Sequence, residues 1–475
     1  MSTILSVGID IGTSTTQLIF SEITMENTAS YFSAPRISIV DKQIIYKSEV
    51  YNTPLIDLTT LDGDKIKDLV ASEFDKAGYV PADVDTGAVI ITGESARKEN
   101  AAVVLEKLSE FAGEFVVSTA GPDLESIIAG KGSGAYQYSM DTNSMVVNLD
   151  IGGGTTNIVG FNDGETVGKV CYDIGGRLVR LTPDYVVQYI SKSAKLVAEA
   201  VGVNIDVGSK TNDSELRRIT DKMADLLAQA LNLATKEPLL GKILTPHSSE
   251  FEITKPIRHI FFSGGVGEAV YNPTEDTVEF GDFGPLLGRS IKENKYFSTG
   301  LVEQAKETIR ATVIGAGTYT TSISGSTIKY SPGVFPLKNI PALKLTPEEE
   351  TEALGGNVSM LSEKIRWFAE QSDSKEILLA MRGPENPSYV EIKTLGRCIV
   401  ESMQKALPAE SPMVVVCESD IAKALGSAMA SYIEDGRRMA SIDNIKIEAG
   451  DYVDIGRPLM DGLVVPVIVK TLLFG

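Results

Sequence analysis

The stretch that decides the fold is Val146-Val147-Asn148-Leu149-Asp150-Ile151-Gly152-Gly153-Gly154-Thr155-Thr156-Asn157-Ile158-Val159-Gly160-Phe161. An apolar run reaches a carboxylate, passes through three glycines and two threonines, and continues as a second apolar run. This pattern predicts a β-hairpin with a polar turn. Glycines let backbone N–H groups converge on an oxyanion, threonine hydroxyls add donors, and Asp150 is suited to a hydrated Mg²⁺. We therefore expect the turn to bind phosphate.

The same plan occurs a second time near the start of the chain, in Ile4-Leu5-Ser6-Val7-Gly8-Ile9-Asp10-Ile11-Gly12-Thr13-Ser14-Thr15-Thr16-Gln17-Leu18-Ile19-Phe20. A third glycine-rich element follows later, Ile260-Phe261-Phe262-Ser263-Gly264-Gly265-Val266-Gly267-Glu268. Glycine-rich turns between strands are common, so one such hairpin alone would decide little. Two copies and a third element in this order make the interpretation specific.

Two Asp-Ile-Gly hairpins followed by an apolar strand that runs into Ser-Gly-Gly resemble three motifs of the actin, sugar-kinase and Hsp70 ATPase superfamily. These are its phosphate-1, phosphate-2 and adenosine motifs. The resemblance covers about residues 1–330. It implies an α/β actin-like ATPase (ribonuclease H-like) fold, in which two duplicated lobes enclose a nucleotide cleft that binds ATP and Mg²⁺.

The resemblance also implies a role for each motif residue. Asp10 and Asp150 are the expected catalytic carboxylates and hold Mg²⁺ through water. The residues expected to bind the phosphates are Gly12, Thr13, Ser14, Thr15, Thr16, Gly152, Gly153, Gly154, Thr155 and Thr156, and those expected to bind the nucleoside are Ser263, Gly264, Gly265, Val266 and Gly267.

Glu94 ends the apolar strand Ala88-Val89-Ile90-Ile91-Thr92-Gly93-Glu94. In the superfamily this strand ends beside the cleft, which implies that Glu94 orients the attacking water as a third catalytic residue. The alternative interpretation is that its carboxylate caps the first turn of the following helix, where a negative charge is favourable.

Length and composition set the organisation of the chain. With 475 residues it exceeds what one core usually supports, so two or three domains are expected. We expect a first lobe at residues 1–145, a second lobe at 146–331 and an appended C-terminal α/β domain at 332–475. Residues 332–347 contain four of the 20 prolines, which indicates a linker.

Three further segments carry local expectations. Residues 121–135 form a glycine cluster that does not follow a strand, which favours a loop. Residues 184–235 have apolar side chains at helical spacing and are expected to be largely helical. Residues 303–317 resemble the helix that closes the second lobe, and its Gly315 and Gly317 would allow close contact with the opposite lobe.

Charge and residue counts exclude several kinds of site. A formal net charge of −20 without a basic stretch argues against nucleic acid and anionic membranes as partners. The three cysteines, Cys171, Cys398 and Cys417, form no metal or disulfide pattern, and two histidines leave almost no basis for a histidine metal site. The first strand leaves no room for a signal peptide and no long apolar run occurs, so a cytoplasmic location is expected.

The whole chain resembles a narrower family. The stretches that carry this resemblance are residues 92–100, 121–126, 418–426 and the Gly456-Arg457-Pro458 ending, and together with the superfamily motifs they are similar to the ethanolamine ammonia-lyase reactivating proteins. The resemblance implies an ATP-dependent, chaperone-like protein that hydrolyses ATP. Its partner is ethanolamine ammonia-lyase, from which damaged cobalamin is released so that adenosylcobalamin, a cofactor of that client, can bind.

Other functions remain open at this point. A small-molecule kinase would use the same cleft with a carboxylate as base, and a filament-forming ATPase would use ATP to assemble. A reactivase of another cobalamin-dependent enzyme, such as a diol dehydratase, is a further alternative. The sequence leaves open whether the chain forms a homo-oligomer and whether it associates with the bacterial microcompartment for ethanolamine.

Overall fold

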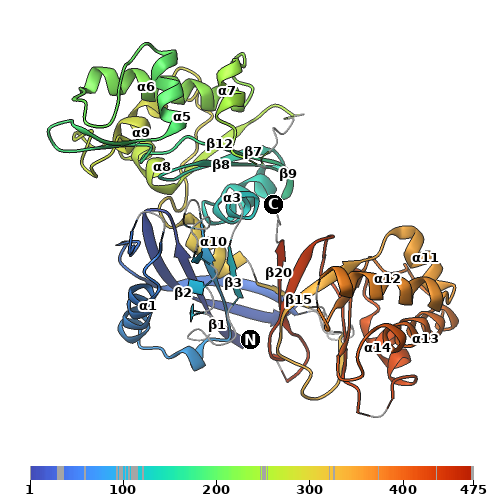
Figure 1. Ribbon diagram of the computed structural model, residues 1–475. Coiled ribbons are helices and arrows are strands. Elements are labelled where there is room, and N and C mark those ends of the chain that lie inside the picture. Colours follow the sequence, from blue (N-terminus) through green and yellow to red (C-terminus); the bar gives the residue numbers. More distant parts are fainter. Residues whose placement is uncertain are drawn as a thin grey trace.

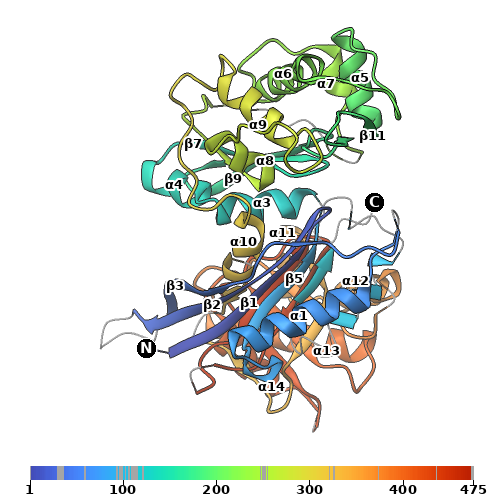
Figure 2. The same cartoon turned by 90° about the vertical axis from the view of Figure 1, so that its left-hand side faces the viewer.

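The computed structural model describes residues 2–28, 37–57, 60–92, 95, 100–101, 103–104, 107–108, 116–119, 122–246, 248, 253, 255–319, 321–324, 327–372, 374–434, 436–459 and 461–471. Three bodies are visible in Figure 1. The N-terminal body (blue) lies below a second body (green to yellow), and a third body (orange to red) stands beside the first. Each body contains a β-sheet with helices packed on it (Figures 1 and 2).

The first lobe is built on a six-stranded sheet in the order β3-β2-β1-β5-β6, with β4 paired to β2. Its strands are β1 (Ser2–Ile11), β2 (Thr15–Asn27), β3 (Ile37–Lys47), β4 (Tyr51–Asn52), β5 (Thr86–Ile91) and β6 (Val116–Thr119). All six residues of β5 are buried, in accord with its continuous apolar sequence.

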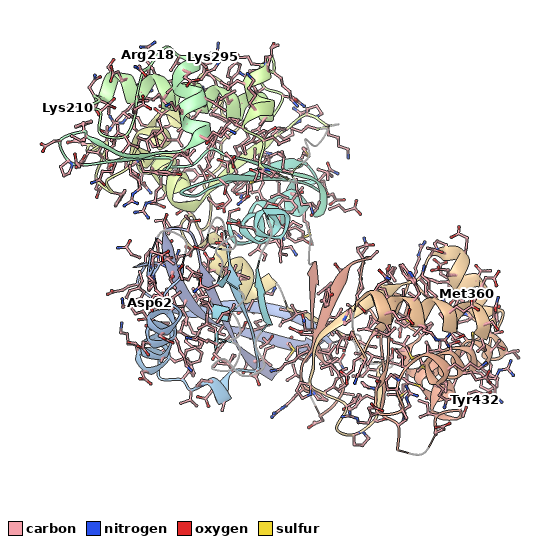
Figure 3. The ribbon with its side chains drawn as sticks, in the orientation of Figure 1. Asp62, Lys210, Arg218, Lys295, Met360 and Tyr432 are labelled. Carbon is pink, nitrogen blue, oxygen red and sulfur yellow. The ribbon has the colours of Figure 1, made fainter. Side chains whose placement is uncertain are left out.

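Helix α1 (Gly63–Ala77) covers this sheet, followed by the short helix η1 (Pro81–Asp83). The side chain of Asp62, labelled in Figure 3, accepts a hydrogen bond from Lys65 N at 3.1 Å and caps the start of α1. Gly78 ends the helix in the left-handed conformation at φ 78°. Ile66, Val70 and Phe74 recur at helical spacing on the buried face of α1.

The second lobe repeats the plan with a four-stranded sheet in the order β12-β7-β8-β9. Its strands are β7 (Met145–Ile151), β8 (Thr156–Asn162), β9 (Glu165–Tyr172) and β12 (His259–Ser263). A separate ribbon joins β10 (Val179–Leu181) to β11 (Val187–Ile190). The helices of this part of the chain are α4 (Ala135–Thr142), α5 (Lys192–Ala200), α6 (Asp213–Ala230), α7 (Pro238–Lys242), α8 (Gly264–Tyr271) and α9 (Gly284–Glu293).

Both lobes share one topology. In each, a meander of three antiparallel strands (β1-β2-β3 and β7-β8-β9) is extended by a strand parallel to its first member, β5 in one lobe and β12 in the other. The turn that joins the first two strands carries the Asp-Ile-Gly motif in both lobes. The predicted α/β actin-like fold with two duplicated lobes is thereby confirmed.

Two helices join the lobes where they meet in Figure 1. Helix α3 (Pro122–Gly132) packs on β7, β8 and β9, whereas α10 (Ala311–Tyr319) packs on β1, β2 and β5. Their backbones touch, since a Cβ on Gly132 would lie 1.9 Å from Ala311 O and one on Gly315 would lie 2.0 Å from Ile128 O. Glycine is therefore required at both contacts.

Two local predictions for the lobes were wrong. Residues 122–132 form helix α3 instead of a loop, because its glycines serve close packing, Gly130 against Val159 and Phe161 of β8 and Gly132 against Ala311 of α10. Residues 187–190 form strand β11 before the helices of the 184–235 segment begin, because this part pairs with β10. The predicted helix at 303–317 begins only at Ala311.

The C-terminal body contains an eight-stranded sheet in the order β13-β20-β19-β15-β16-β17-β18-β14. Its strands are β13 (Thr321–Ile323), β14 (Lys329–Tyr330), β15 (Leu337–Lys344), β16 (Leu378–Met381), β17 (Met413–Cys417), β18 (Met439–Ile442), β19 (Asp451–Ile455) and β20 (Pro466–Thr471). Strands β15, β16, β17 and β18 run parallel to one another, whereas β19 and β14 pair antiparallel at the two sides of this group. The predicted linker at 332–347 was wrong in part, because β15 lies within it and pairs with both β16 and β19.

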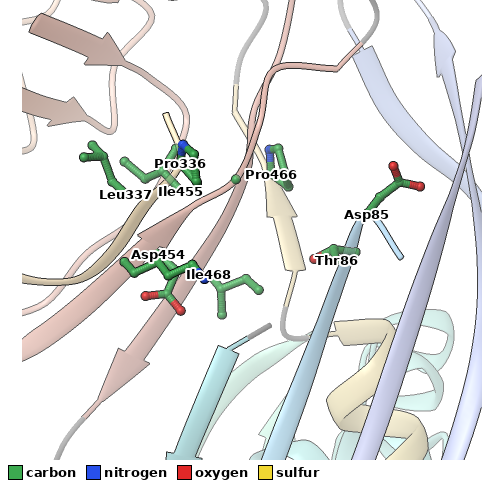
Figure 4. Close-up of a pocket in the computed structure, with 10 residues that line it drawn as sticks. Asp85, Thr86, Pro336, Leu337, Asp454, Ile455, Pro466 and Ile468 are labelled. Carbon is green, nitrogen blue, oxygen red and sulfur yellow. The ribbon is translucent and has the colours of Figure 1, made fainter. Parts of the chain in front are cut away.

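Four helices accompany the parallel strands, α11 (Pro347–Leu354), α12 (Val358–Gln371), α13 (Tyr389–Ala406) and α14 (Ala422–Ala430). Met360 and Tyr432 mark the helical side of this domain in Figure 3 and pack against its core. A crevice separates this domain from the first lobe, lined on one side by Asp85 and Thr86 and on the other by residues of β15, β19 and β20 (Figure 4).

No helix in the described part of the chain is long and apolar enough to cross a membrane. The three cysteines are buried and form no disulfide with one another.

Candidate functional site

Two buried carboxylates lie at the ends of equivalent strands. Asp10 is the penultimate residue of β1 and Asp150 that of β7, and they are 6% and 5% exposed. Asp10 Oδ1 accepts a hydrogen bond from Thr92 Oγ1 at 3.0 Å, and Asp150 Oδ1 accepts one from Ser263 Oγ at 2.6 Å. Thr92 directly follows β5, which runs parallel to β1, and Ser263 is the last residue of β12, which runs parallel to β7. The duplicated topology thus places an equivalent hydroxyl beside each carboxylate.

Burial makes both carboxyl groups easier to protonate. Desolvation raises the pKa of Asp10 to about 7, a rise that the Thr92 hydrogen bond opposes and the nearby charge of Asp150 increases. Desolvation also raises the pKa of Asp150 to about 6, opposed by hydrogen bonds from Ser263 and Thr312. Since Asp150 acts on Asp10, the two acids from opposite lobes share one electrostatic environment. A cation placed between them would favour the charged forms.

The two turns close in the same way. Gly12 N donates to Thr15 O at 2.8 Å in the first turn, and Gly152 N donates to Thr155 O at 3.0 Å in the second. The last threonine of each turn is fully buried. Thr16 Oγ1 lies 3.1 Å from Thr53 Oγ1, and Thr156 Oγ1 donates to Ile174 O at 2.8 Å. These two hydroxyls hold the turns in place, which leaves the remaining turn residues to face a ligand.

The turns approach each other across the lobes. A Cβ on Gly153 would lie 2.7 Å from Ser14 Oγ and 3.3 Å from Arg177 Cγ and Cδ. Gly176 N donates to Gly152 O at 2.9 Å and Arg177 N donates to Gly153 O at 2.7 Å, so the backbone of this segment lies directly on the second turn. The Arg177 guanidinium is beside Asp282, with Nε 3.4 Å from Oδ2.

Several buried polar atoms around the carboxylates have no hydrogen-bond partner. Among the described residues they are Ser14 Oγ, Gln17 Oε1, Asn148 Oδ1, Asn157 Oδ1 and Arg310 Nε. In the β1-β2 hairpin Gln17 lies opposite Asp10, and in the β7-β8 hairpin Asn157 lies opposite Asp150. Buried polar groups are normally paired, so orphan atoms concentrated in one place indicate a ligand or ordered water.

Residues 309–312, at the start of α10, connect this site to both lobes. Thr312 hydrogen-bonds the Asp150 carboxylate, and Gln17 Nε2 donates to Ile309 O at 3.2 Å. Arg310 Nη2 donates to Ser48 O at 3.0 Å, so the segment also contacts the end of β3. Neither Thr312 nor Arg310 was predicted, because they belong to none of the three motifs and approach the carboxylates only when α10 packs on the first lobe.

The third motif forms the junction of β12 and α8. Gly264 has φ +81°, and a Cβ there would lie 2.4 Å from Ile151 O, so only glycine fits beside the end of β7. Val266 is buried, whereas a Cβ on Gly265 would meet no atom within 4 Å. The open position is where a nucleoside could lie against the backbone. Glu94, the proposed water-orienting residue, lies outside the described residues.

Comparison with known proteins identifies the family of the chain. The family model for the ethanolamine utilisation protein EutA matches residues 2–475. The chain belongs to the EutA family. Two relatives named ethanolamine ammonia-lyase reactivase EutA, from Escherichia coli K12 and Salmonella typhimurium LT2, are each 36% identical over 472 residues, which is 99% of this chain and 98% of theirs.

Solved structures with a similar chain path are more distant. A Ppx/GppA enzyme from Aquifex aeolicus is 18% identical with a TM-score of 0.37, and covers 66% of this chain and 90% of its own. The ethanolamine utilization protein EutJ from Carboxydothermus hydrogenoformans is 15% identical with a TM-score of 0.31, and covers 66% of this chain and 89% of its own. At these values the likeness carries no weight for activity.

The residues around Asp10 and Asp150 fit Mg²⁺ and a nucleoside triphosphate chemically. Two carboxylates are the kind of ligand that holds a hydrated Mg²⁺, and the opposed turns offer backbone N–H groups to phosphate oxygens. The orphan atoms around them require a polar partner.

Proposed function

We propose that this protein is an ATP-dependent reactivating factor that exchanges damaged cobalamin on ethanolamine ammonia-lyase for adenosylcobalamin. The observation that carries the proposal is the pair of buried, destabilised carboxylates at equivalent hairpins, in a chain that belongs to the EutA family. The names of the two 36% identical relatives supply the client. Adenosylcobalamin is proposed as the cofactor that the client requires.

In the proposed mechanism the chain itself binds and orients ATP. Asp10 and Asp150 hold Mg²⁺ through water, and this ion, when bound, would neutralise charge on the phosphates. The backbone of residues 12–15 and 152–155 donates to phosphate oxygens, while Thr16 and Thr156 keep the two turns in shape. Residues 263–267 take the nucleoside. Glu94 is proposed to orient the attacking water, with helix capping as its alternative role.

Lobe movement is proposed to link the cleft to the client. Helix α10 packs on the first sheet while Thr312, near its start, hydrogen-bonds Asp150 of the second lobe. A ligand that draws the two carboxylates together therefore biases the angle between the lobes. Tightly bound cobalamin leaves slowly, since affinity resides mostly in the off-rate. A closed state with higher affinity for an open form of the lyase would speed that release.

A small-molecule kinase of the same fold is the second candidate, because the same two carboxylates would serve phosphoryl transfer to a hydroxyl. A reactivase of another cobalamin-dependent dehydratase is the third. The proposed domains are 1–145, 146–331 and 332–475, although helix α3, within the first of these ranges, packs on the second sheet. We also propose a cytoplasmic location; homo-oligomer formation and a place in the ethanolamine microcompartment are open options.

Recovery of lyase activity tests this function. Ethanolamine ammonia-lyase is inactivated with a cobalamin that does not exchange, and is then mixed with this protein, ATP, Mg²⁺ and adenosylcobalamin. We expect activity to return only with ATP, and Asp150→Asn to abolish the recovery. ATP turnover without recovery of the lyase would reject the client, and a screen of hydroxyl acceptors for phosphoryl transfer would then decide for or against the kinase.

A further inference from the structure

Unpartnered buried polar atoms gather in a second place far from the cleft in sequence. In the described part of the chain they are Ser419 Oγ, Ser441 Oγ and Asp443 Oδ1. All three belong to the C-terminal domain, in which Ser419 follows β17, Ser441 lies in β18 and Asp443 follows β18. Strands β17 and β18 are parallel, so their carboxyl ends lie at one edge of the sheet. The kind of feature that marks the nucleotide cleft therefore recurs here.

Asp443 is the centre of this edge. Its side chain is 1% exposed, and Oδ2 accepts hydrogen bonds from Ala422 N at 3.2 Å and from Thr327 Oγ1. The bond from Ala422 caps the start of α14, whose own N-cap residue, Ile421, provides no side-chain cap. Capping accounts for Oδ2, but it leaves Oδ1 buried without a partner. A buried acceptor of this kind is costly unless something binds it.

A second carboxylate meets the first. Thr327 Oγ1 contacts Asp420 Oδ1 as well as Asp443 Oδ2, so the two carboxylates share one hydroxyl. One hydroxyl carries one hydrogen and can donate to only one of the two carboxylates. Burial and the charge of Asp420 both raise the pKa of Asp443. Two carboxylates that share one hydroxyl cannot both stay negative unless a positive charge lies with them.

The charges near the pair do not supply that compensation. Burial, Thr327, Ala422 and Asp420 act on the Asp443 carboxyl, and all of these except the two hydrogen-bond donors raise its pKa. Lys344, at the end of β15, forms an ion pair with Glu418 at 2.6 Å, and Lys446 pairs with Glu448 at 3.1 Å. These two lysines already have acidic partners, and within the described part of the chain no lysine or arginine is among the groups that shift the pKa of Asp443.

We propose that Asp420, Asp443 and Thr327 form a binding site for a hard divalent cation, Mg²⁺ or Ca²⁺, in the C-terminal domain. The oxygens come from three separate segments, before β14, after β17 and after β18, so the cation would tie them together. Asp420 is exposed, which leaves room for water to complete the coordination shell, as these ions require when a site has two carboxylates. The site is independent of the nucleotide cleft and of the proposed reactivase function.

Cation binding to the full chain without nucleotide tests the proposal. We expect calorimetric titration with CaCl₂ or MgCl₂ to show a binding event that persists in Asp150→Asn, which alters the cleft. Asp420→Asn should weaken this event by more than the roughly 10- to 100-fold that loss of an outer-shell partner costs. Glu370→Gln, which removes one exposed charge from α12 of the same domain, should leave it unchanged.

Thermal unfolding gives a second readout that does not depend on titration. Without a divalent cation, Asp420→Asn should raise the unfolding midpoint because it removes the repulsion; with the cation, the wild-type midpoint should rise and that of the variant should not. Asp443→Asn would also disturb the hydrogen bond that caps α14, so Thr327→Val serves as the second variant. Absence of binding, binding lost in Asp150→Asn but kept in Asp420→Asn, or a midpoint insensitive to cations would overturn the proposal and leave a shared proton between the carboxylates.

Discussion

The two hairpins share a sequence plan but are supported in different ways. The first turn is held by side-chain hydroxyls, since Thr53 Oγ1 donates to Gly12 O at 2.8 Å and Ser95 Oγ donates to the same oxygen at 3.0 Å. The second turn is held by backbone, through the bonds from Gly176 N and Arg177 N to Gly152 O and Gly153 O. Backbone contact requires closer approach than a side-chain bond, which explains the glycine at position 175 in the segment that packs on the second turn.

The distances that a Cβ would have to its neighbours show which glycines of the second lobe are required by packing. A Cβ on Gly175 would lie 2.5 Å from Gly153 O, whereas a Cβ on Gly152 would find its nearest neighbour, Thr155 O, at 3.8 Å. Glycines in the second turn and in the segment packed on it therefore have different roles. Gly175 and Gly153 are required by packing within the protein, while Gly152 is open to a ligand.

The largest expected effect concerns the carboxylates, where the two hairpins should behave alike. Asp10→Asn and Asp150→Asn should each lower the rate of ATP hydrolysis by about 100- to 1,000-fold, the range for loss of one preorganised electrostatic group. The measurement is steady-state phosphate release. Asp282→Asn is the matched control, since Asp282 is also a buried acid of raised pKa, about 6, but lies at the Arg177 contact. An equal loss in all three variants would mean that burial, and not position, matters.

Gly175→Ala should separate the hairpins most clearly in stability. The added methyl group would overlap the backbone of Gly153 and Gly154, and we expect a loss of about 2–3 kcal/mol in the free energy of unfolding of the second lobe. Gly152→Ala should keep stability and lower nucleotide affinity only. Urea unfolding followed by circular dichroism measures the first effect. Equal destabilisation by both substitutions would contradict the distinction between packing and ligand glycines.

The pH dependence of stability tests the shared environment of the two acids. Their folded-state pKa values, about 7 for Asp10 and about 6 for Asp150, lie above the unfolded value of 3.8. The protonated acids are therefore favoured by folding, and stability is full near pH 4 and falls as pH rises through 6 to 7. Without nucleotide we expect these two acids to give a loss of about 4 kcal/mol between pH 5 and pH 8, the larger part from Asp10.

The same measurement with ligand and with variants supplies the control. Mg²⁺ and ATP should remove most of the loss between pH 5 and pH 8, because they favour the charged carboxylates. Asp10→Asn should flatten the profile more than Asp150→Asn, since Asp10 has the higher pKa. A wild-type profile that rises between pH 5 and pH 8 would contradict the assigned pKa directions.

The smallest effect is expected at the hydroxyls that hold the first turn. Thr53→Val removes the donor to Gly12 O and the contact with Thr16, which should cost about 1–2 kcal/mol in the first lobe. Thr53→Ser keeps the hydroxyl and should restore most of the stability. Thermal unfolding measures both variants. Unchanged stability in Thr53→Val would show that the first turn, like the second, relies on its backbone.

The fold and the motif positions followed from the sequence because they depend on local pattern. The Asp-Ile-Gly hairpins and the strand before Ser263 were predicted from the pattern of apolar residues and glycines, and each lies within or overlaps an observed element. The failures, at residues 122–132, 187–190 and 337–344, have a common cause. Glycine and proline were taken as breakers there, or apolar spacing as helical, where contacts between distant segments decide the conformation.

The sequence by itself determined that two Asp-Ile-Gly hairpins exist, since strand, turn and carboxylate lie within about 17 consecutive residues in each, and that a glycine-rich third element follows them. Only the tertiary structure decided what surrounds them. Thr92, Thr312 and Arg177 reach the carboxylates or turns from other elements, and Asp420 meets Asp443 through strand order in the C-terminal sheet. Such neighbours depend on packing between segments far apart in the chain, which no local pattern encodes.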